Sequence, residues 1–381
     1  MIGLPAEVLS QAADVAWPAP VMAFCVALLG TGLMIPAARR GGLIDRAAPG
    51  EEFRKPRREP VALVGGMALA LAALIGGWPG VGFAPLVDAV QDGGMKAGLP
   101  WPPEVLAGGV AFAALLLGLL DDRLGQRETV SPNPQRLLPR CGGLLTTVPA
   151  RLAAHMILGL GAGLAHGQVF LAEPGSALLW AGAGLLVGVS VATFDHADGL
   201  AAGLGALALW APAPVLAAAC LGFVPWNFSW RRRIFKPGTE ASAAQQATAG
   251  RPPYSEAAPP AYLGNAGSSL LGAWILLTPA AWPALIVPVV DLVRVSHLRM
   301  MAGRRPWSGD RCHLGHRLLA CGFTPLPVAL MCAAATLPAV LTPILRPSSP
   351  LFLAGGLAAS LGAYVFLLVI SPRLAPDGSA E

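Results

Sequence analysis

The chain has 381 residues, of which 55% are hydrophobic and 12% are charged, and its formal net charge is +5. This apolar composition excludes an ordinary soluble domain and predicts a polytopic helical membrane protein. The six cysteines form no CxxC pair, which argues against a disulfide framework or a structural zinc site.

Apolar runs of about 20 residues, the length that crosses a bilayer, recur along the whole chain. We expect helices near 18–37, 61–80, 104–120, 149–167, 176–193, 199–210, 212–225, 267–283, 284–302, 324–343 and 350–370. The pair between residues 199 and 225 is broken at residues 211–214, so a short or re-entrant hairpin is an alternative to two full spans. The expected fold class is an all-α membrane bundle of about 10–11 helices, forming a single domain over residues 1–381.

Most of the 26 basic residues lie in four segments, at 39–58, 123–151, 231–251 and 299–317. With the helices above, all four segments fall on one face, which the positive-inside rule assigns to the cytoplasm. Because this asymmetry is a topology signal, the net charge gives no support to nucleic-acid binding. Residues 126–147 and 228–258 look like cytoplasmic loop insertions, and the second is polar and rich in Ala, Ser, Gln and Pro.

Two carboxylates, Asp121 and Asp122, follow the apolar run 105–120 in the stretch GLLDDRLG. A carboxylate in mid-membrane costs about 2.5–3.5 kcal/mol, so a pair at a helix end favours a cation or phosphate site at the membrane surface. The alternative is a solvated helix end followed by a turn. Asp291 and Arg294 lie inside another apolar run, where ionisable groups are either functional or paired with each other.

Further polar motifs lie on the same expected face, both before and after the Asp pair in the chain. They are RRGGLIDR and RKPRREPVALVGG in the first loop, TFDHADGLAAGLG at 193–205, GFVPWN at 222–227, PPAYLGNAGSSLLG at 259–272, and VPVVDLVRVSHLRMMAGRRPWSGDRCHLGHRLLACG at 287–322. Together with GLLDDRLG, this series resembles the polyprenyl-phosphate sugar-1-phosphate transferases of glycosyltransferase family 4, over roughly residues 36–322. The resemblance is closer to the N-acetylglucosamine branch than to the muramyl-pentapeptide branch.

The resemblance implies transfer of a sugar-1-phosphate, with N-acetylhexosamine favoured, from a UDP-sugar to undecaprenyl or another polyprenyl phosphate. UMP would be released at the cytoplasmic face of the plasma (inner) membrane, and Mg²⁺, or alternatively Mn²⁺, would be the cofactor. The oligomeric state is not predicted by the pattern. The implied catalytic residues are Asp121, Asp122 and Asp195, and the implied metal ligands are Asp121, Asp122 and Asn265. The implied substrate-binding residues are Arg54, Lys55, Asp198, Asn227, Asp310, Arg311, His313 and His316.

Several positions depart from the family pattern. Asn265 replaces an acidic metal ligand, His196 replaces a Gly, Val189 and Ala192 replace asparagines, and Gly315 lies within a His-x-His-His cluster. These departures support an alternative function, a degenerate relative that binds polyprenyl phosphate or a partner without turnover. A lipid or solute transporter is a third possibility, which explains the helices but not the motif order. Asp195 and Asp198 have an alternative role as a helix-start cap, since Asp198 and Gly199 open an apolar segment. The basic residue that the family places after the Asp pair is either Arg136 or Arg151.

Overall fold

The apolar runs form helices, because a segment inside a bilayer must satisfy its backbone polar groups internally. A computed structural model describes residues 18–45, 60–78, 102–130, 147–167, 174–229, 259–346 and 349–373, and the structural statements below concern these residues. Arg54, Lys55 and most of both expected insertions lie outside them. The helices are α2 (Pro18–Gly41), α3 (Gly65–Ile75), α5 (Pro103–Val130), α7 (Val148–Ala165), α8 (Pro174–Phe194), α9 (Leu200–Leu209), α10 (Pro214–Phe223), α12 (Gly264–Leu276), α13 (Ile286–Met301), α14 (Leu314–Ala320), α15 (Pro325–Leu345) and α16 (Pro350–Ile370), with 3₁₀ helices η1 (Val224–Asn227) and η2 (Pro279–Leu285).

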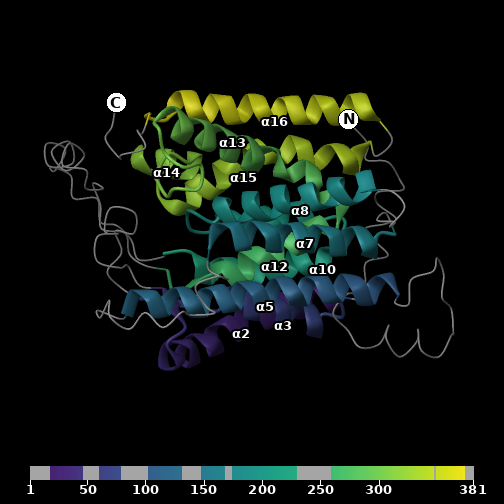
Figure 1. Ribbon diagram of the computed structural model, residues 1–381, viewed down its shortest axis with the longest axis vertical. Coiled ribbons are helices and arrows are strands. Elements are labelled where there is room, and N and C mark those ends of the chain that lie inside the picture. The colour runs from purple at the N-terminus through teal and green to yellow at the C-terminus, as the bar shows by residue number, and fades with distance from the viewer. Residues whose placement is uncertain are drawn as a thin grey trace, which may run out of the picture.

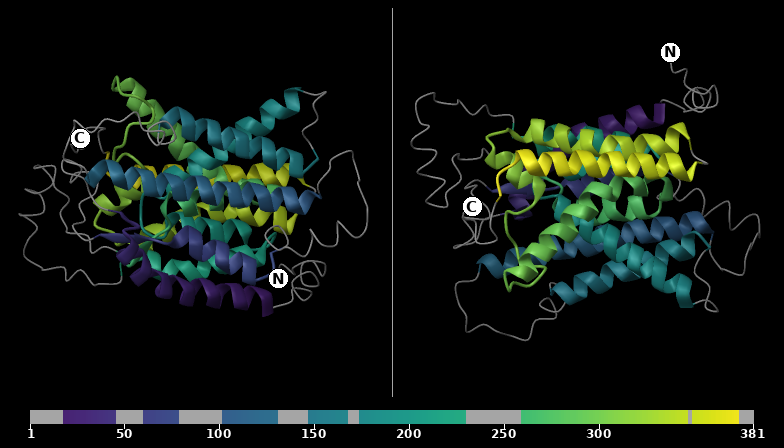
Figure 2. Two further views of the ribbon diagram at one scale, coloured as in Figure 1. Left: turned by 60° about the horizontal axis from the view of Figure 1, so that its bottom comes forward. Right: turned by 90° about the horizontal axis from the view of Figure 1, so that it is seen from above.

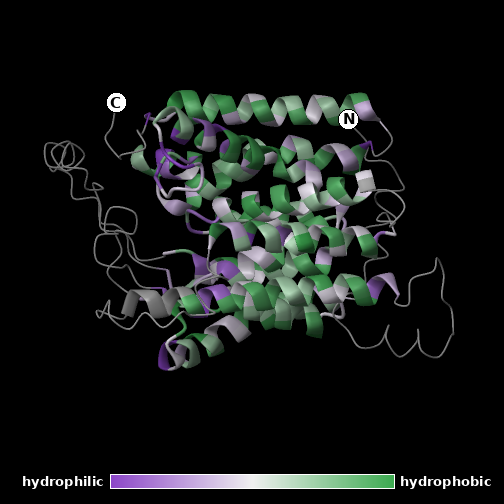
Figure 3. Ribbon diagram, viewed as in Figure 1, coloured by the Kyte–Doolittle hydropathy of each residue, from purple (hydrophilic) through white to green (hydrophobic). Residues whose placement is uncertain are grey.

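Within the described ranges, seven helical segments are long and apolar enough to cross a membrane. They are Pro18–Gly41, Pro103–Leu124, Val148–Ala165, Gly175–Phe194, Pro279–Met301, Pro325–Leu345 and Pro350–Ile370. The views in Figures 1 and 2 show the long helices side by side with roughly parallel axes. Hydrophobic residues dominate the helix bodies, whereas hydrophilic residues gather at the end that carries α14 (Figure 3). The predicted polytopic helical membrane fold is confirmed.

The centre of the bundle is α12, which packs against α3, α5, α8 and α9. Ten of its 13 residues are buried, among them Trp274, Leu271 and Ile275. A helix that is apolar on all sides belongs in an interior position. The outer helices instead expose leucines such as Leu33, Leu179 and Leu351, as expected for surfaces that face lipid.

Two helices occupy the doubtful region between residues 199 and 225. Helices α9 and α10 contain 10 residues each and pack against each other. At 1.5 Å per residue each is about 15 Å long, roughly half the hydrocarbon thickness of a bilayer. The region is therefore a short helical hairpin, which was the alternative to two full spans.

A small sheet joins three distant segments and corrects the expected helix over 61–80. Strand β2 (Val61–Leu63) pairs antiparallel with β1 (Ile44–Asp45) and parallel with β3 (Ala261–Tyr262). The helix therefore begins at Gly65, after the strand, and ends at Ile75. The strand depends on pairing with residues 261–262, a long-range contact that local hydropathy does not report. Similarly, the helix expected over 267–283 ends at Leu276, and η2 leads into α13.

Helix α5 does not end at the Asp pair. It continues to Val130, so the insertion expected over 126–147 begins with helical residues, and its last residue, Thr147, is the N-cap of α7. The solvated-terminus interpretation of Asp121 and Asp122 is therefore wrong. Helix α5 packs against α12 and α7.

Candidate active site

The side chain of Asp122 joins α5 to the start of α12. Its Oδ1 accepts a hydrogen bond from the Asn265 N–H at 2.9 Å, and its Oδ2 accepts one from the Ala266 N–H at 3.1 Å. Only 5% of Asp122 is exposed. The first N–H groups of a helix have no partner within the helix and favour a negative charge. Asp122 thus stabilises the N-terminus of α12 and fixes it against α5.

This contact requires a close approach of the two helices at Gly118. A Cβ at Gly118 would overlap the backbone of Asn265 and Ala266, which cannot move as a flexible side chain can. We expect Gly118→Ala to force α5 away from α12 and to lower the unfolding temperature of the detergent-purified protein, with overpacking costing about 1–3 kcal/mol. Thermal unfolding followed by circular dichroism measures this effect.

Gly109 on the same helix provides a matched control, because a Cβ there meets nothing within 4 Å. Gly109→Ala should keep or slightly raise the unfolding temperature, since alanine favours helix over glycine. Equal unfolding temperatures for the two variants would contradict the required approach at Gly118.

Asp121 faces a different partner. Its Oδ1 forms an ion pair of 2.7 Å with Arg151, which lies in the first turn of α7 and is exposed. Of the two basic residues considered from sequence, Arg151 is the one that the structure brings to the pair, whereas Arg136 lies outside the described residues. Next to it, Arg123 donates to the Gly41 carbonyl at 3.0 Å and so links α5 to the end of α2. The acidic pair is thus held between three helices.

Asp195 lies in the turn between α8 and α9, close to the start of α12. Its Oδ2 lies 3.1 Å from the hydroxyl of Ser268, which also donates to the Gly264 carbonyl at 2.9 Å. Burial and, to a lesser extent, the charges of Asp198 and Asp122 raise the pKa of Asp195 to about 8, although the Ser268 hydrogen bond lowers it. Three carboxylates from two segments therefore affect each other, and Asp195 holds a proton at neutral pH when no cation compensates the charge.

Asn227 supports this acidic turn. It is 1% exposed; its Oδ1 accepts from the Gly199 N–H at 2.9 Å, and its Nδ2 donates to the Ala261 carbonyl at 3.1 Å. Both ends of the amide bind backbone groups, so Asn227 fixes the turn to β3. Its role in binding substrate stays a prediction. The N-cap of α9 is Gly199, which excludes that role for Asp198.

The expected metal ligands meet only in part. Asp121 and Asp122 are neighbours on α5, but the Asn265 side chain is exposed at the start of α12 and only its backbone N–H contacts Asp122. Among the described residues, no three His, Cys, Asp or Glu side chains are grouped so that they could hold a metal ion. The donor chemistry is nevertheless that of a hard cation, because the charged side-chain oxygens here are those of carboxylates.

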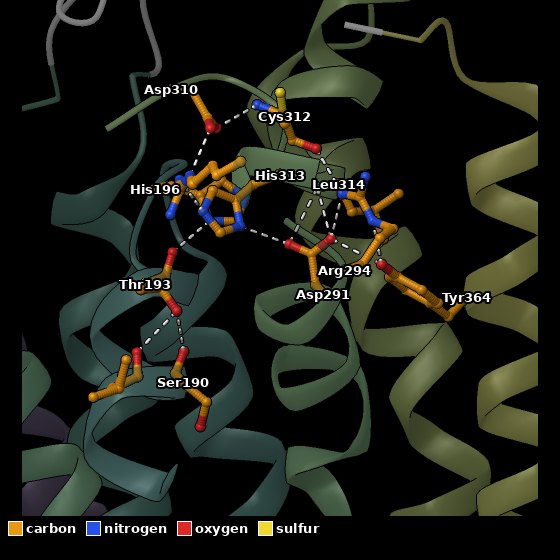
Figure 4. Close-up of polar contacts among 12 residues, drawn as sticks. Ser190, Thr193, His196, Asp291, Arg294, Asp310, Cys312, His313, Leu314 and Tyr364 are labelled. Carbon is orange, nitrogen blue, oxygen red and sulfur yellow. Dashed lines mark hydrogen bonds and ion pairs between the residues drawn. The ribbon is translucent and has the colours of Figure 1, made fainter. Parts of the chain in front are cut away.

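A second polar cluster surrounds Asp291 on α13 (Figure 4). Asp291 is 1% exposed, and its carboxylate accepts hydrogen bonds from four groups. The donors are Arg294 NH2 at 2.8 Å, Tyr364 OH at 2.9 Å, His313 Nδ1 at 2.8 Å and the Leu314 N–H at 3.2 Å. The paired alternative for Asp291 and Arg294 is thus observed, and the pair also anchors the start of α14 and the last helix, α16.

The loop before α14 is fixed by a buried ion pair. Arg299 Nε donates to Asp310 Oδ2 at 2.6 Å, and Asp310 Oδ1 accepts from the Cys312 N–H at 2.9 Å. Although burial raises the pKa of Asp310, the hydrogen bond from Arg299 lowers it below its usual range. Asp310 and His313, expected to bind substrate, are therefore engaged with Arg299 and Asp291 of α13. Arg311 and His316 are each half-buried in the same loop and on α14.

His196 is a site residue that the sequence reading treated only as a departure. Its ring stacks on that of His313, with centroids 4.8 Å apart, and lies 4.9 Å from that of His316. Burial lowers the pKa of His196 to about 3, so the imidazole is neutral. The signal that could have revealed it is its position between Asp195 and Asp198. Ser268 was likewise missed, although it lies in a recognised motif.

Fold and site together define a multi-pass membrane protein in which carboxylates and imidazoles gather at one end of a helical bundle. Over 314 residues the chain is 30% identical to a decaprenyl-phosphate N-acetylglucosaminephosphotransferase of Mycolicibacterium smegmatis, covering 74% of this chain and 72% of the relative. A relative of the same name in Mycobacterium tuberculosis is 30% identical over 60% of this chain and 59% of its own length. An undecaprenyl-phosphate alpha-N-acetylglucosaminyl 1-phosphate transferase of Escherichia coli is 33% identical over 16% of this chain and 21% of its own length. No protein-family model matches.

The chain belongs to the polyprenyl-phosphate sugar-1-phosphate transferase family. The resemblance read from the ordered motifs is thereby confirmed, and the protein is a transferase by family.

Proposed function

We propose that this protein transfers N-acetylglucosamine-1-phosphate from its UDP-sugar to a polyprenyl phosphate at the cytoplasmic face of the inner membrane. The observation that carries the proposal is the meeting of Asp122, the Asp195 turn and the start of α12 at one end of the bundle, in a chain of this family. The relatives act, by name, on decaprenyl or undecaprenyl phosphate. The concentration of basic residues in the loops at this end supports the cytoplasmic orientation.

The reaction joins two anions. An oxygen of the lipid phosphate attacks the β-phosphorus of the UDP-sugar, the bond from that phosphorus to the oxygen bridging to the α-phosphate breaks, and UMP leaves. Such a transfer depends on positioning and charge neutralisation more than on covalent help from the protein. One carboxylate of the pair Asp121 and Asp122 is the proposed group that orients or deprotonates the acceptor phosphate.

Mg²⁺, or Mn²⁺ in its place, fits the chemistry of the donors Asp122, Asp195 and Asp198, with Asp121 and Asn265 as further candidates. The bound ion would neutralise phosphate charge during transfer. The raised pKa of Asp195 supports a cation here, because the charges of Asp198 and Asp122 contribute to it. Arg311 and His316 are the proposed phosphate contacts of the loop before α14 and of α14 itself.

Transfer is tested directly in membranes. Membranes that contain the protein should release UMP from UDP-N-acetylglucosamine only when polyprenyl phosphate is added, and membranes without the protein should release none. If the protein binds polyprenyl phosphate but releases no UMP from any UDP-N-acetylhexosamine, it is the non-catalytic binder considered above. Lipid or solute uptake by proteoliposomes without UMP release would instead indicate a transporter.

The cation site predicts a pH-dependent affinity. Since the proton on Asp195 must leave before its carboxylate can bind Mg²⁺, affinity should increase by up to about tenfold per pH unit from about pH 6 and level off near the pKa of about 8. Calorimetric titration of Mg²⁺ in two buffers of different ionisation enthalpy measures both the affinity and the released proton. Asp195→Asn is the matched control, because its side chain cannot ionise; a pH-independent affinity in the wild type would contradict the assignment.

A further inference from the structure

Three imidazoles from two separate segments meet where the acidic turn faces the loop before α14. His196 comes from the turn that also carries Asp195 and Asp198, whereas His313 precedes α14 and His316 lies within it. Figure 4 shows His196 beside His313. The ring of His196 is nearly parallel to that of His313, with an interplanar angle of 23°, and is tilted by 47° to that of His316. The two segments are thus in direct contact through aromatic rings.

The position of His196 is determined on both sides of its ring. Nδ1 lies 2.7 Å from the Thr193 carbonyl, which can only accept, so Nδ1 carries the proton and donates it. Nε2 is buried and has no hydrogen-bond partner among the residues that the structure describes. The neutral ring therefore contributes contact and shape, not charge, to the site.

The contact depends on the absence of a side chain at Gly315. A Cβ there would lie 2.6 Å from His196 Nε2 and 2.9 Å from Leu200 Cδ1, closer than real Cβ atoms approach other atoms. The ring of His196 cannot move away easily, because it is stacked on His313 and bound to Thr193. The ring of His196 therefore fits in this position only because residue 315 has no side chain.

His313, on which His196 stacks, is itself bound to Asp291. Contacts therefore run from the acidic turn through His196 and His313 to α13 and, by Tyr364, to α16. The turn supplies carboxylates and the loop supplies basic groups, so the distance between them determines how two phosphate-bearing substrates lie relative to each other.

We propose that His196 is a positioning residue that fixes the acidic turn against the loop before α14, and that Gly315 is required to admit its ring. The expected effect on catalysis rests on the proposed transferase function. Loss of the ring leaves each substrate's own contacts in place but loosens their relative geometry. The expected result is a lower kcat with nearly unchanged KM for either substrate.

The test is a reciprocal exchange. His196→Gly should lower kcat about ten- to a hundredfold, in line with the effect of small misplacements on group transfer. Gly315→His should lower kcat and also the unfolding temperature, because the two side chains overlap. In the double variant the new imidazole occupies the vacated space, so kcat should exceed that of either single variant and the unfolding temperature should recover.

Gly203 on α9 offers a matched control, because a Cβ there meets nothing within 4 Å. Gly203→Ala should leave kcat and the unfolding temperature unchanged, whereas Gly315→Ala should lower both.

A second readout does not depend on turnover. In protein with ¹⁵N-labelled histidine, the ring of His196 shifts the His313 imidazole signals, and His196→Gly should remove this shift. If UMP release fails for every variant but the spectra and the unfolding temperatures follow the expected pattern, the pairing stands and only the transferase proposal fails. A double variant no better than the more damaged single variant, or unchanged His313 signals in His196→Gly, would overturn the inference.

Discussion

Asp122→Asn should reduce the rate of UMP release by about a hundredfold or more and should also destabilise the protein. The carboxylate accepts from two backbone N–H groups, whereas an amide presents one oxygen and one NH₂ group, which would face a second donor. Loss of one helix-terminal hydrogen bond costs about 1–2 kcal/mol, and loss of the charge removes stabilisation in the transition state. UMP release and thermal unfolding of the same preparation measure the two effects.

Asp121→Asn separates the two effects. Asp121 pairs with an exposed arginine, and exposed ion pairs contribute only about 0–1 kcal/mol. This variant should lose most activity while keeping a nearly normal unfolding temperature. A near-normal rate for Asp122→Asn would instead show that its carboxylate only joins two helices.

Asp291→Asn should cause the largest loss of stability, about 3–5 kcal/mol, because it breaks the ion pair of a buried carboxylate and leaves the partly buried Arg294 without its counter-charge. Four donors converge on this one carboxylate, and an amide cannot accept from all of them. The start of α14 should loosen, and UMP release should fall with it. Chemical or thermal unfolding in detergent is the measurement.

The comparison variant is Tyr364→Phe, which removes one of the four hydrogen bonds and leaves the ion pair intact. Its expected cost is about 1 kcal/mol. If Asp291→Asn were as mildly affected as Tyr364→Phe, the carboxylate would not be the centre of this cluster.

The membrane fold could be predicted because the length and hydropathy of an apolar run are local properties. Helix α16 follows its predicted range of 350–370 for this reason. Strand β2 could not be predicted, because its partners, β1 and β3, lie elsewhere in the chain and β3 pairs with it from about 200 residues away. The end of α5 was predicted too early, because the two carboxylates that end the apolar run lie within the helix.

The residue types of the site were predictable, but their orientation was not. Asp121 and Asp122 were recognised from their place after an apolar run, and both make specific contacts. Asn227 and Asp310 lie in other motifs of the series, and their polar atoms form hydrogen bonds within the protein. Sequence alone does not show which hydrogen bonds are already made. His196 was missed because the residue that admits it, Gly315, is distant in the chain.

The bond between Asp122 and the start of α12 also constrains the order in which the chain can be assembled during synthesis. The acceptor and its donor are separated by 143 residues, so α5 is translated long before α12 exists. Until then, the buried carboxylate has no helix N-terminus to bind, and β2 has no β3 beside it. Because chains are made from the N-terminus, the acidic site cannot form before α12 has been made. A chain interrupted before α12 therefore contains the Asp pair but lacks the helix N-terminus that Asp122 binds.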